Sequence, residues 1–131
     1  MIKEIAFTGT SVTDMKRARA FYEETLGLKP SEEIAGGKWI EYTVGNGTFA
    51  ITNINPKWTP SDQGTAVGFE VDDFEKTNAE LKKRGTRYWL EPSETPICWM
   101  AIVQDPDGNK VVIQSQIKIK HAPTQRGGSL A

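Results

Sequence analysis

The sequence predicts an α+β fold in which two β-α-β-β-β modules form a curved mixed sheet around a cleft. The first observation is a repeat: residues 12–18, VTDMKRA, are echoed by residues 71–77, VDDFEKT, at an offset of 59 residues (71 − 12). In both copies an apolar run ends in Val, Asp follows two residues later, and a helical pattern begins. The second observation is that three strand-like runs follow each helix. Such halves usually face one another across a shared cleft.

Composition limits the classes of function. The chain has 131 residues, enough for one domain with a real core. Its 16 Lys and Arg against 17 Asp and Glu give a net charge of −1, so no basic surface is expected for nucleic acid or for an anionic membrane. The sequence has no transmembrane run and no signal-peptide core. The single cysteine, Cys98, fits a reducing compartment, and we expect a cytoplasmic protein.

The first module is expected over residues 2–54. Asp14 can cap a helix that runs to about Leu26, because its carboxylate can accept hydrogen bonds from the first unpaired amides. The apolar residues of this helix recur every three or four positions and make one buried stripe, and Gly27 can end it in a left-handed conformation. Strands are predicted at residues 5–12, 29–35, 38–44 and 48–54, with Gly-rich turns between the last three.

The second module repeats this order over residues 64–116, after a Pro-containing linker at residues 55–63. Its helix begins at Asp72 or Asp73 and ends near Arg84. The residues from 117 to 131 are polar and Gly-rich and are expected to be a frayed tail of the single domain. The strands of this module are predicted at residues 65–71, 87–91, 98–104 and 110–116.

Three segments resemble a known family. They are residues 12–28, with the helix sequence FYEETLGL, residues 69–73, FEVDD, and the last turn, residues 105–109, DPDGN. In this order and spacing they resemble the vicinal oxygen chelate superfamily, which includes glyoxalase I, bleomycin-resistance proteins, fosfomycin-modifying enzymes and extradiol dioxygenases. The resemblance spans about residues 2–116. It implies the two-module fold and a homodimer, sometimes with exchanged halves so that the cleft combines two chains.

The resemblance also implies where a metal would be held. The family's enzymes bind a divalent metal on His and Glu side chains from the first and fourth strands of each module. These positions fall at Phe7, Ala66 and Val112, with the fourth near Ala50 or Thr52, and none of these is a metal ligand of the expected kind. The only histidine, His121, lies in the tail. We therefore expect no metal and no other cofactor.

The predicted cleft suits an organic molecule instead. Alternation along the strands places apolar Phe7, Ala66 and Val112 on its floor and a few polar side chains beside them, and such a mixture binds small organic ligands. The same alternation puts Thr8 and Thr10 on the helix side, where apolar residues are expected. Trp39, Trp58, Trp89 and Trp99 are candidate walls, with Gln116 a further polar group. The predicted ligand-binding residues are Phe7, Trp39, Ala66, Glu70, Trp99, Val112 and Gln114.

Glu70 is the candidate catalytic group. A carboxylate that faces an apolar cleft has its pKa raised by desolvation, which suits a general base, whereas an exposed or Arg-paired Glu70 has no such role. Glu41 is a weaker candidate. Cys98 has no histidine within reach to activate it, so a buried inert thiol is the simpler interpretation.

Three functions stay open. The first is a metal-free small-molecule-binding protein of the bleomycin-resistance type, which sequesters or senses an organic ligand. The second is an enzyme, either a glyoxalase-like lyase or isomerase or a dioxygenase-like enzyme, with a metal-free or unrecognised site. The third is a structural subunit with a filled cleft.

Overall fold

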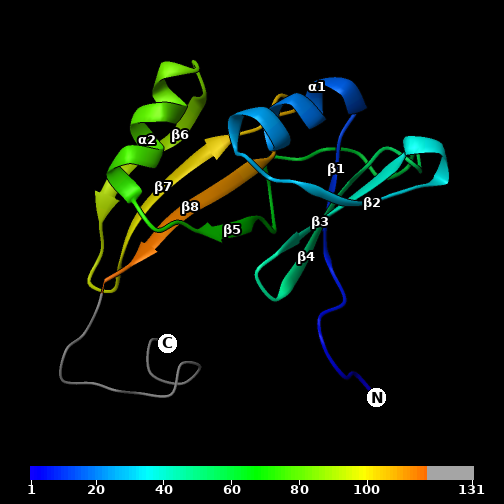
Figure 1. Cartoon of the computed structure of the whole chain (residues 1–131), viewed down its shortest axis with the longest axis horizontal. Helices are drawn as coiled ribbons and strands as arrows, with labels where there is room; N and C mark the ends of the chain where they lie inside the picture. Colours follow the sequence, from blue (N-terminus) through cyan, green and yellow to red (C-terminus); the bar gives the residue numbers. More distant parts are fainter. Residues whose placement is uncertain (118–131) are drawn as a thin grey trace.

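The computed structural model describes residues 1–117, and the predicted tail from residue 118 onward, including His121, lies outside the described residues. The predicted two-module α+β fold is confirmed (Figure 1). The first module contains β1 (Thr8–Ser11), α1 (Met15–Arg19), η1 (Ala20–Thr25), β2 (Pro30–Ile34), η2 (Ala35–Gly37), β3 (Trp39–Val44) and β4 (Gly47–Thr52). The second contains β5 (Val67–Glu70), α2 (Phe74–Lys83), β6 (Arg87–Glu94), β7 (Cys98–Gln104) and β8 (Lys110–Gln116).

Each module forms its own four-stranded mixed sheet. The strand orders are β1-β4-β3-β2 and β5-β8-β7-β6, so the last strand of each module returns beside the first. The pair formed by the first and last strand of each module is parallel, and the other pairs are antiparallel. The eight strands are therefore divided between two sheets rather than continuous in one.

The first helix differs from the single α-helix predicted for residues 14–26. Asp14 caps it as expected, since its side chain accepts from the amide of Arg17 at 3.0 Å. After Arg19 the helix widens into the π-helix η1, in which the amide of Leu26 donates to the carbonyl of Phe21 at 2.9 Å. Gly27 then adopts a positive φ of 79° and ends the helix as predicted.

The second helix begins where the repeat predicts. Asp73, rather than Asp72, is its N-cap, and the carboxylate of Asp73 accepts from the amide of Lys76 at 2.9 Å. Because Asp14 and Asp73 cap in the same way at an offset of 59 residues (73 − 14), helix positions in the two modules can be compared one by one.

Several strand ends were predicted wrongly. β1 begins at Thr8 rather than residue 5, because Thr8 to Ser11 are the residues that pair with β4. β5 is likewise shorter than residues 65–71. β6 extends to Glu94 instead of ending at residue 91, and its register against β7 shifts twice, which is typical of bulged edge strands.

One hydrophobic core joins the two modules. It lies between the helix-facing sides of the sheets, where the rings of Phe49 and Phe69 meet at 5.4 Å. Figure 1 shows both helices along one side of the molecule, with the sheets beneath them. No helix within residues 1–117 is long and apolar enough to cross a membrane. The buried core residues are Val12, Ala18, Phe21, Tyr22, Ile40, Tyr42, Phe49, Ile51, Leu81, Val103, Val111 and Ile113.

The two threonines of β1 do lie on the helix side. Thr8 is paired with Phe49 and Thr10 with Ile51, and neighbouring partners in a sheet point to the same face. Both threonines are half-buried. The alternation is therefore as predicted. Gly9, between the two threonines, lies on the side of the sheet that carries no helix.

Candidate functional site

The predicted site residues lie mainly on the sheet faces that carry no helix, which we call the open faces. On the first open face Gly9 lies beside Ala50, Ala50 lies beside Glu41, and Trp39 lies beside Thr52. Phe7 precedes β1 on the same side. These positions alternate with the core residues of β3 and β4, so a side chain here cannot contribute to the shared core.

Three aromatic rings gather on the first open face. The ring of Phe7 meets that of Trp39 edge-on at 5.1 Å between centroids, and Trp39 lies 6.5 Å from Trp58. Phe7 is 42% exposed and Trp58 is 41% exposed, so the group is open to solvent. The indole N–H of Trp39 donates to the carboxylate of Glu41 at 2.8 Å, which fixes the plane of the ring. We call Phe7, Trp39 and Trp58 the aromatic cluster.

Trp58 reaches this cluster from the linker because the sheet has room for it. A Cβ atom on Gly9 would lie 2.9 Å from the Trp58 ring, so glycine lets the indole lie against the backbone of β1. The hydroxyl of Ser11 donates to the carbonyl of Trp58 at 2.5 Å and holds the linker in place. The sequence signal for this arrangement is a tryptophan in a Pro-containing loop, and it was not enough to place Trp58 beside Gly9.

The second open face carries the predicted polar residues. Gly68 lies beside Val112, and Glu70 lies beside Gln114. The carboxylate of Glu70 accepts from the side-chain amide of Gln114 at 3.2 Å and from the backbone amide of Gln116 at 2.8 Å. Glu70 is exposed, so the burial on which the general-base hypothesis depends is not present in the single chain. Ala66, directly before β5, is also exposed.

Trp99 does not lie on an open face, and its assignment to the cleft is corrected. It is paired with Ser115 and lies two residues before Ala101, whose side chain is in the buried layer on the helix side. Its ring contacts that of Phe74 on α2, with 6.3 Å between centroids. The physical reason is the alternation of β7, which sends Trp99 to the same side as Ala101 and Val103.

Two other candidates have structural contacts. The ammonium group of Lys110 lies 3.8 Å from the centroid of the Trp89 ring, a cation–π contact. Cys98 is buried, and its sulfur lies 3.3 Å from the hydroxyl of Thr95. The hydroxyl of Thr95 is not a base that could activate the Cys98 thiol.

The two open faces belong to different sheets that pack through their opposite sides. Phe7 and Trp39 are therefore on one sheet, while Glu70, Val112 and Gln114 are on the other. The structure brings each group together but does not bring the two groups to one pocket within the chain.

A separate groove of about 590 Å³ lies between the modules, beside the end of β5. Its lining mixes apolar residues such as Leu28, Val44 and Phe69 with polar and charged ones. Glu70 lies at its rim, together with the acidic side chains of Asp72 and Glu80. The carboxylate of Glu70 itself is bonded to Gln114 and Gln116 on the second open face.

The positions at which relatives hold a metal do not fit one here. Phe7, Ala66 and Val112 offer only hydrocarbon, while a divalent ion needs three or four convergent His, Cys, Asp or Glu donors. Within residues 1–117 no cluster of three or more such side chains is placed to hold a metal ion. We therefore derive no chemical step through a metal.

Comparisons with known proteins agree with this geometry. Paired β-α-β-β-β modules with open sheet faces define a class of two-module α+β proteins. The sequence matches the model of the Glyoxalase/Bleomycin resistance protein/Dioxygenase superfamily over residues 4–113, so the chain belongs to this superfamily. A search of curated protein sequences found no match.

Solved structures with the same fold differ in their described roles. TnmS3, an antibiotic binding protein from Streptomyces sp. CB03234, is 24% identical with a TM-score of 0.73, over 88% of this chain and 98% of that one. A glyoxalase/dioxygenase from Nostoc punctiforme is 18% identical with a TM-score of 0.74, over 88% and 92%. Lactoylglutathione lyase from Agrobacterium tumefaciens is 16% identical with a TM-score of 0.70, over 88% and 95%.

Proposed function

We propose that this protein binds a small organic molecule on its open faces and sequesters or senses it without chemistry. The observation that carries the proposal is the exposed aromatic cluster of Phe7, Trp39 and Trp58. Adjacent exposed aromatic rings on a soluble protein mark a binding surface, because leaving them in water costs free energy that a ligand can recover.

The second open face supplies polar contacts for the same ligand. One hydrogen bond joins the side chains of Gln114 and Glu70, and Val112 lies two residues before Gln114 on the same face. A few oriented polar groups beside apolar surface fix the orientation of an organic ligand. The antibiotic binding protein TnmS3 has the same fold, which supports an antibiotic-like organic molecule as the ligand class.

The site is complete only in a homodimer. Since the open faces of one chain are on separate sheets, the first open face of one chain would meet the second open face of its partner. This arrangement buries the aromatic cluster and gives the ligand two walls. We also place the protein in the cytoplasm, in accord with its single cysteine.

A thermal-shift and calorimetric screen against a panel of aromatic antibiotics that includes bleomycin tests the proposal. We expect at least one member to bind, and Phe7→Ala to weaken it about tenfold, because about 1.4 kcal/mol of apolar contact is lost. Ile2→Ala is the matched control, since Ile2 is an exposed apolar residue that precedes the sheet. Equal effects of the two substitutions would reject the open face as the site.

The alternative is a lyase or isomerase, or a dioxygenase-like enzyme, in which Glu70 acts as a base. Glu70→Gln separates it from the binding protein, because glutamine keeps the size and one acceptor of glutamate but cannot take a proton. A binding protein keeps most of its affinity in Glu70→Gln, whereas a base-dependent enzyme loses turnover of an α-ketoaldehyde adduct.

A further inference from the structure

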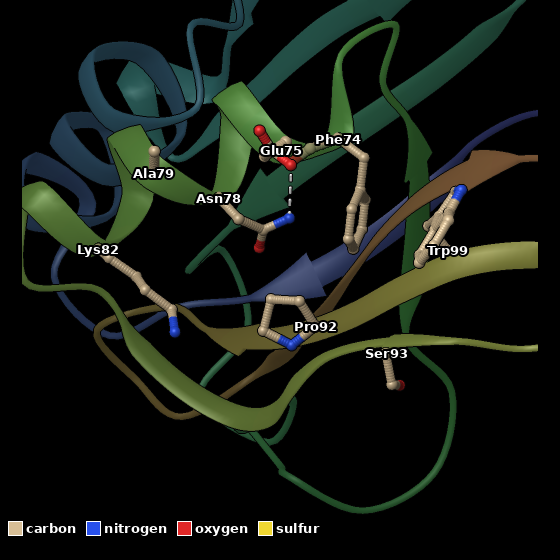
Figure 2. Close-up of a pocket in the computed structure, with 8 residues that line it drawn as sticks. All are labelled: Phe74, Glu75, Asn78, Ala79, Lys82, Pro92, Ser93 and Trp99. Carbon is tan, nitrogen blue, oxygen red and sulfur yellow. Dashed lines mark hydrogen bonds between the residues drawn. The ribbon is translucent and has the colours of Figure 1, made fainter.

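A pocket of about 610 Å³ lies on the helix side of the second module, between α2 and the strands β6 and β7 (Figure 2). The rings of Phe74 and Trp99 stand at one end, Lys82 stands at the other, and Pro92 lies below them. The rings of Phe74 and Trp99 are inclined by 31° to each other, and both residues line the pocket. This pocket is on the opposite side of the sheet from the second open face.

The first module shows why the pocket exists. Arg19 lies five residues after the capping Asp14, and Asn78 lies five residues after the capping Asp73. In the first module the guanidinium of Arg19 reaches Glu23 at 2.6 Å on the helix and Glu33 at 3.1 Å on β2. These contacts close the space between helix and edge strand.

In the second module the shorter Asn78 joins the helix to the edge strand β6 and leaves a pocket beside it. Its amide donates to the carbonyl of Phe74 at 2.8 Å, and its oxygen accepts from the hydroxyl of Tyr88 on β6 at 2.5 Å. The result is a fixed polar group in the wall of a pocket whose other walls are largely aromatic and apolar.

From this difference between the modules we propose a second small-molecule site, which takes a neutral, planar aromatic molecule with one hydrogen-bond acceptor. The flat ring stacks on Phe74 and Trp99, as aromatic rings prefer. The second N–H of the Asn78 amide faces the acceptor. A pocket of this size accommodates a ligand of two or three fused rings.

The charges at the mouth favour a neutral ligand. Lys82 is already paired with Glu91, and its ammonium group lies 5.0 Å from the centroid of the Tyr88 ring. Because its charge is already paired, Lys82 attracts an anionic ligand only weakly. Glu75, on the other side of the mouth, disfavours an anion further.

The test is a calorimetric titration of the full chain with 2-naphthol, compared with two variants of the pocket. Ala79→Trp fills the pocket from an exposed helix position, and Trp99→Ala removes one aromatic wall. We expect saturable binding to the parent protein and at least a tenfold loss of affinity in each variant. Circular dichroism verifies that both variants fold. If Trp99→Ala does not fold, the comparison of Ala79→Trp with the parent is the test.

Lys83→Trp is the matched control, because it places the same side chain at another exposed position of α2 that does not line this pocket. Its affinity for 2-naphthol should equal that of the parent. The proposal is overturned if 2-naphthol does not bind saturably, if Ala79→Trp binds as well as the parent, or if Lys83→Trp loses as much affinity as Ala79→Trp. It is also overturned if Ala79→Trp changes the number of chains in the assembly, because the pocket is then a subunit contact. Loss of antibiotic binding in Phe7→Ala concerns the open face alone, so the two proposals fail separately.

Discussion

Gly9 and Gly68 occupy equivalent positions in β1 and β5, 59 residues apart (68 − 9), but only Gly9 lies beneath an aromatic ring. A Cβ atom on Gly68 would lie 3.7 Å from the Cβ of Val112, which is an ordinary contact. On Gly9 it would lie 2.9 Å from the ring of Trp58 and 3.2 Å from that of Phe7. One residue type therefore has two different roles in the two modules.

Gly9→Ala should displace Trp58 from the first open face. We expect a change in tryptophan emission, a stability loss of about 1 kcal/mol from overpacking, and weaker binding of the antibiotic ligand. Gly68→Ala is the matched control and should leave emission unchanged. The measurements are fluorescence spectra and urea unfolding. Identical spectra for parent and Gly9→Ala would show that Trp58 does not rest on β1.

Strand alternation predicted the faces of most site residues. Phe7, Glu70 and Val112 lie on the sides expected, because a strand with one buried face fixes the direction of every side chain. Trp99 was placed in the cleft as a candidate wall without regard to its alternation with Ala101. Trp58 was expected as a candidate wall, but its place over Gly9 could not be predicted, because it depends on a loop crossing a sheet rather than on a local pattern.

At the scale of elements, the repeat predicted both helix starts, since each depends on one capping carboxylate. The π-helix of η1 was not predictable, because its sequence has the same apolar spacing as an α-helix. The strand predicted at residues 87–91 is confirmed, but its extension to Glu94 was missed, because a proline such as Pro92 usually marks the end of a strand and only the pairing with β7 extends it.

Tyr88 links β6 to α2 through Asn78, and because of this contact the stability of the fold decreases at alkaline pH. Burial, and secondly the charge of Glu91, raises the pKa of Tyr88 to about 12 from its ordinary value of 10.0. Because this pKa is raised in the folded state, the contribution of Tyr88 to the free energy of unfolding is full below pH 10. It is lost as pH rises from 10 toward about 12.

We expect Tyr88→Phe to reduce the loss of stability between pH 9 and pH 11, although the variant is less stable at pH 9 because the bond to Asn78 is gone. Urea midpoints at the two pH values measure this. Desolvation also raises the pKa values of the buried Tyr22 and Tyr42. The loss of stability that these two residues cause at alkaline pH remains in the variant. An identical pH dependence in parent and variant would contradict the assignment to Tyr88.

At the scale of the whole molecule, the last hairpin of the second module fastens the two modules together. Asp105 is fully buried, and its carboxylate accepts from the hydroxyl of Tyr22 in the first module at 2.8 Å. It also accepts from the amides of Asp107 and Asn109, each at 2.9 Å. The side chain of Asn109 donates to the carbonyl of Ser11 at 2.9 Å.

Asp105→Ala should therefore destabilise the entire fold rather than one hairpin. The loss is about 3 kcal/mol or more, since several buried donors lose their acceptor. Tyr22→Phe removes a single donor from the same carboxylate and should cost about 1 kcal/mol. Urea unfolding followed by circular dichroism checks both. A loss below that of Tyr22→Phe would show that Asp105 does not join the modules.

The proposed dimer predicts that two defective chains repair one another. Trp39→Ala impairs the first open face, and Val112→Trp blocks the second. When equal amounts of the two variants are unfolded and refolded together, half of the dimers are mixed, and one of the two sites in each mixed dimer is intact, so about a quarter of the sites should bind. Light scattering should give twice the 14.6 kDa of one chain. No recovery of binding would place each site within a single chain.

The most direct test of the account is the affinity of chelator-treated protein for its tightest antibiotic ligand, measured by calorimetry beside elemental analysis of the same sample. The account predicts unchanged affinity without metal, because hydrocarbon at Phe7, Ala66 and Val112 and the amide of Gln114 make the contacts. Binding that disappears with the chelator and returns with a stoichiometric divalent ion would contradict it.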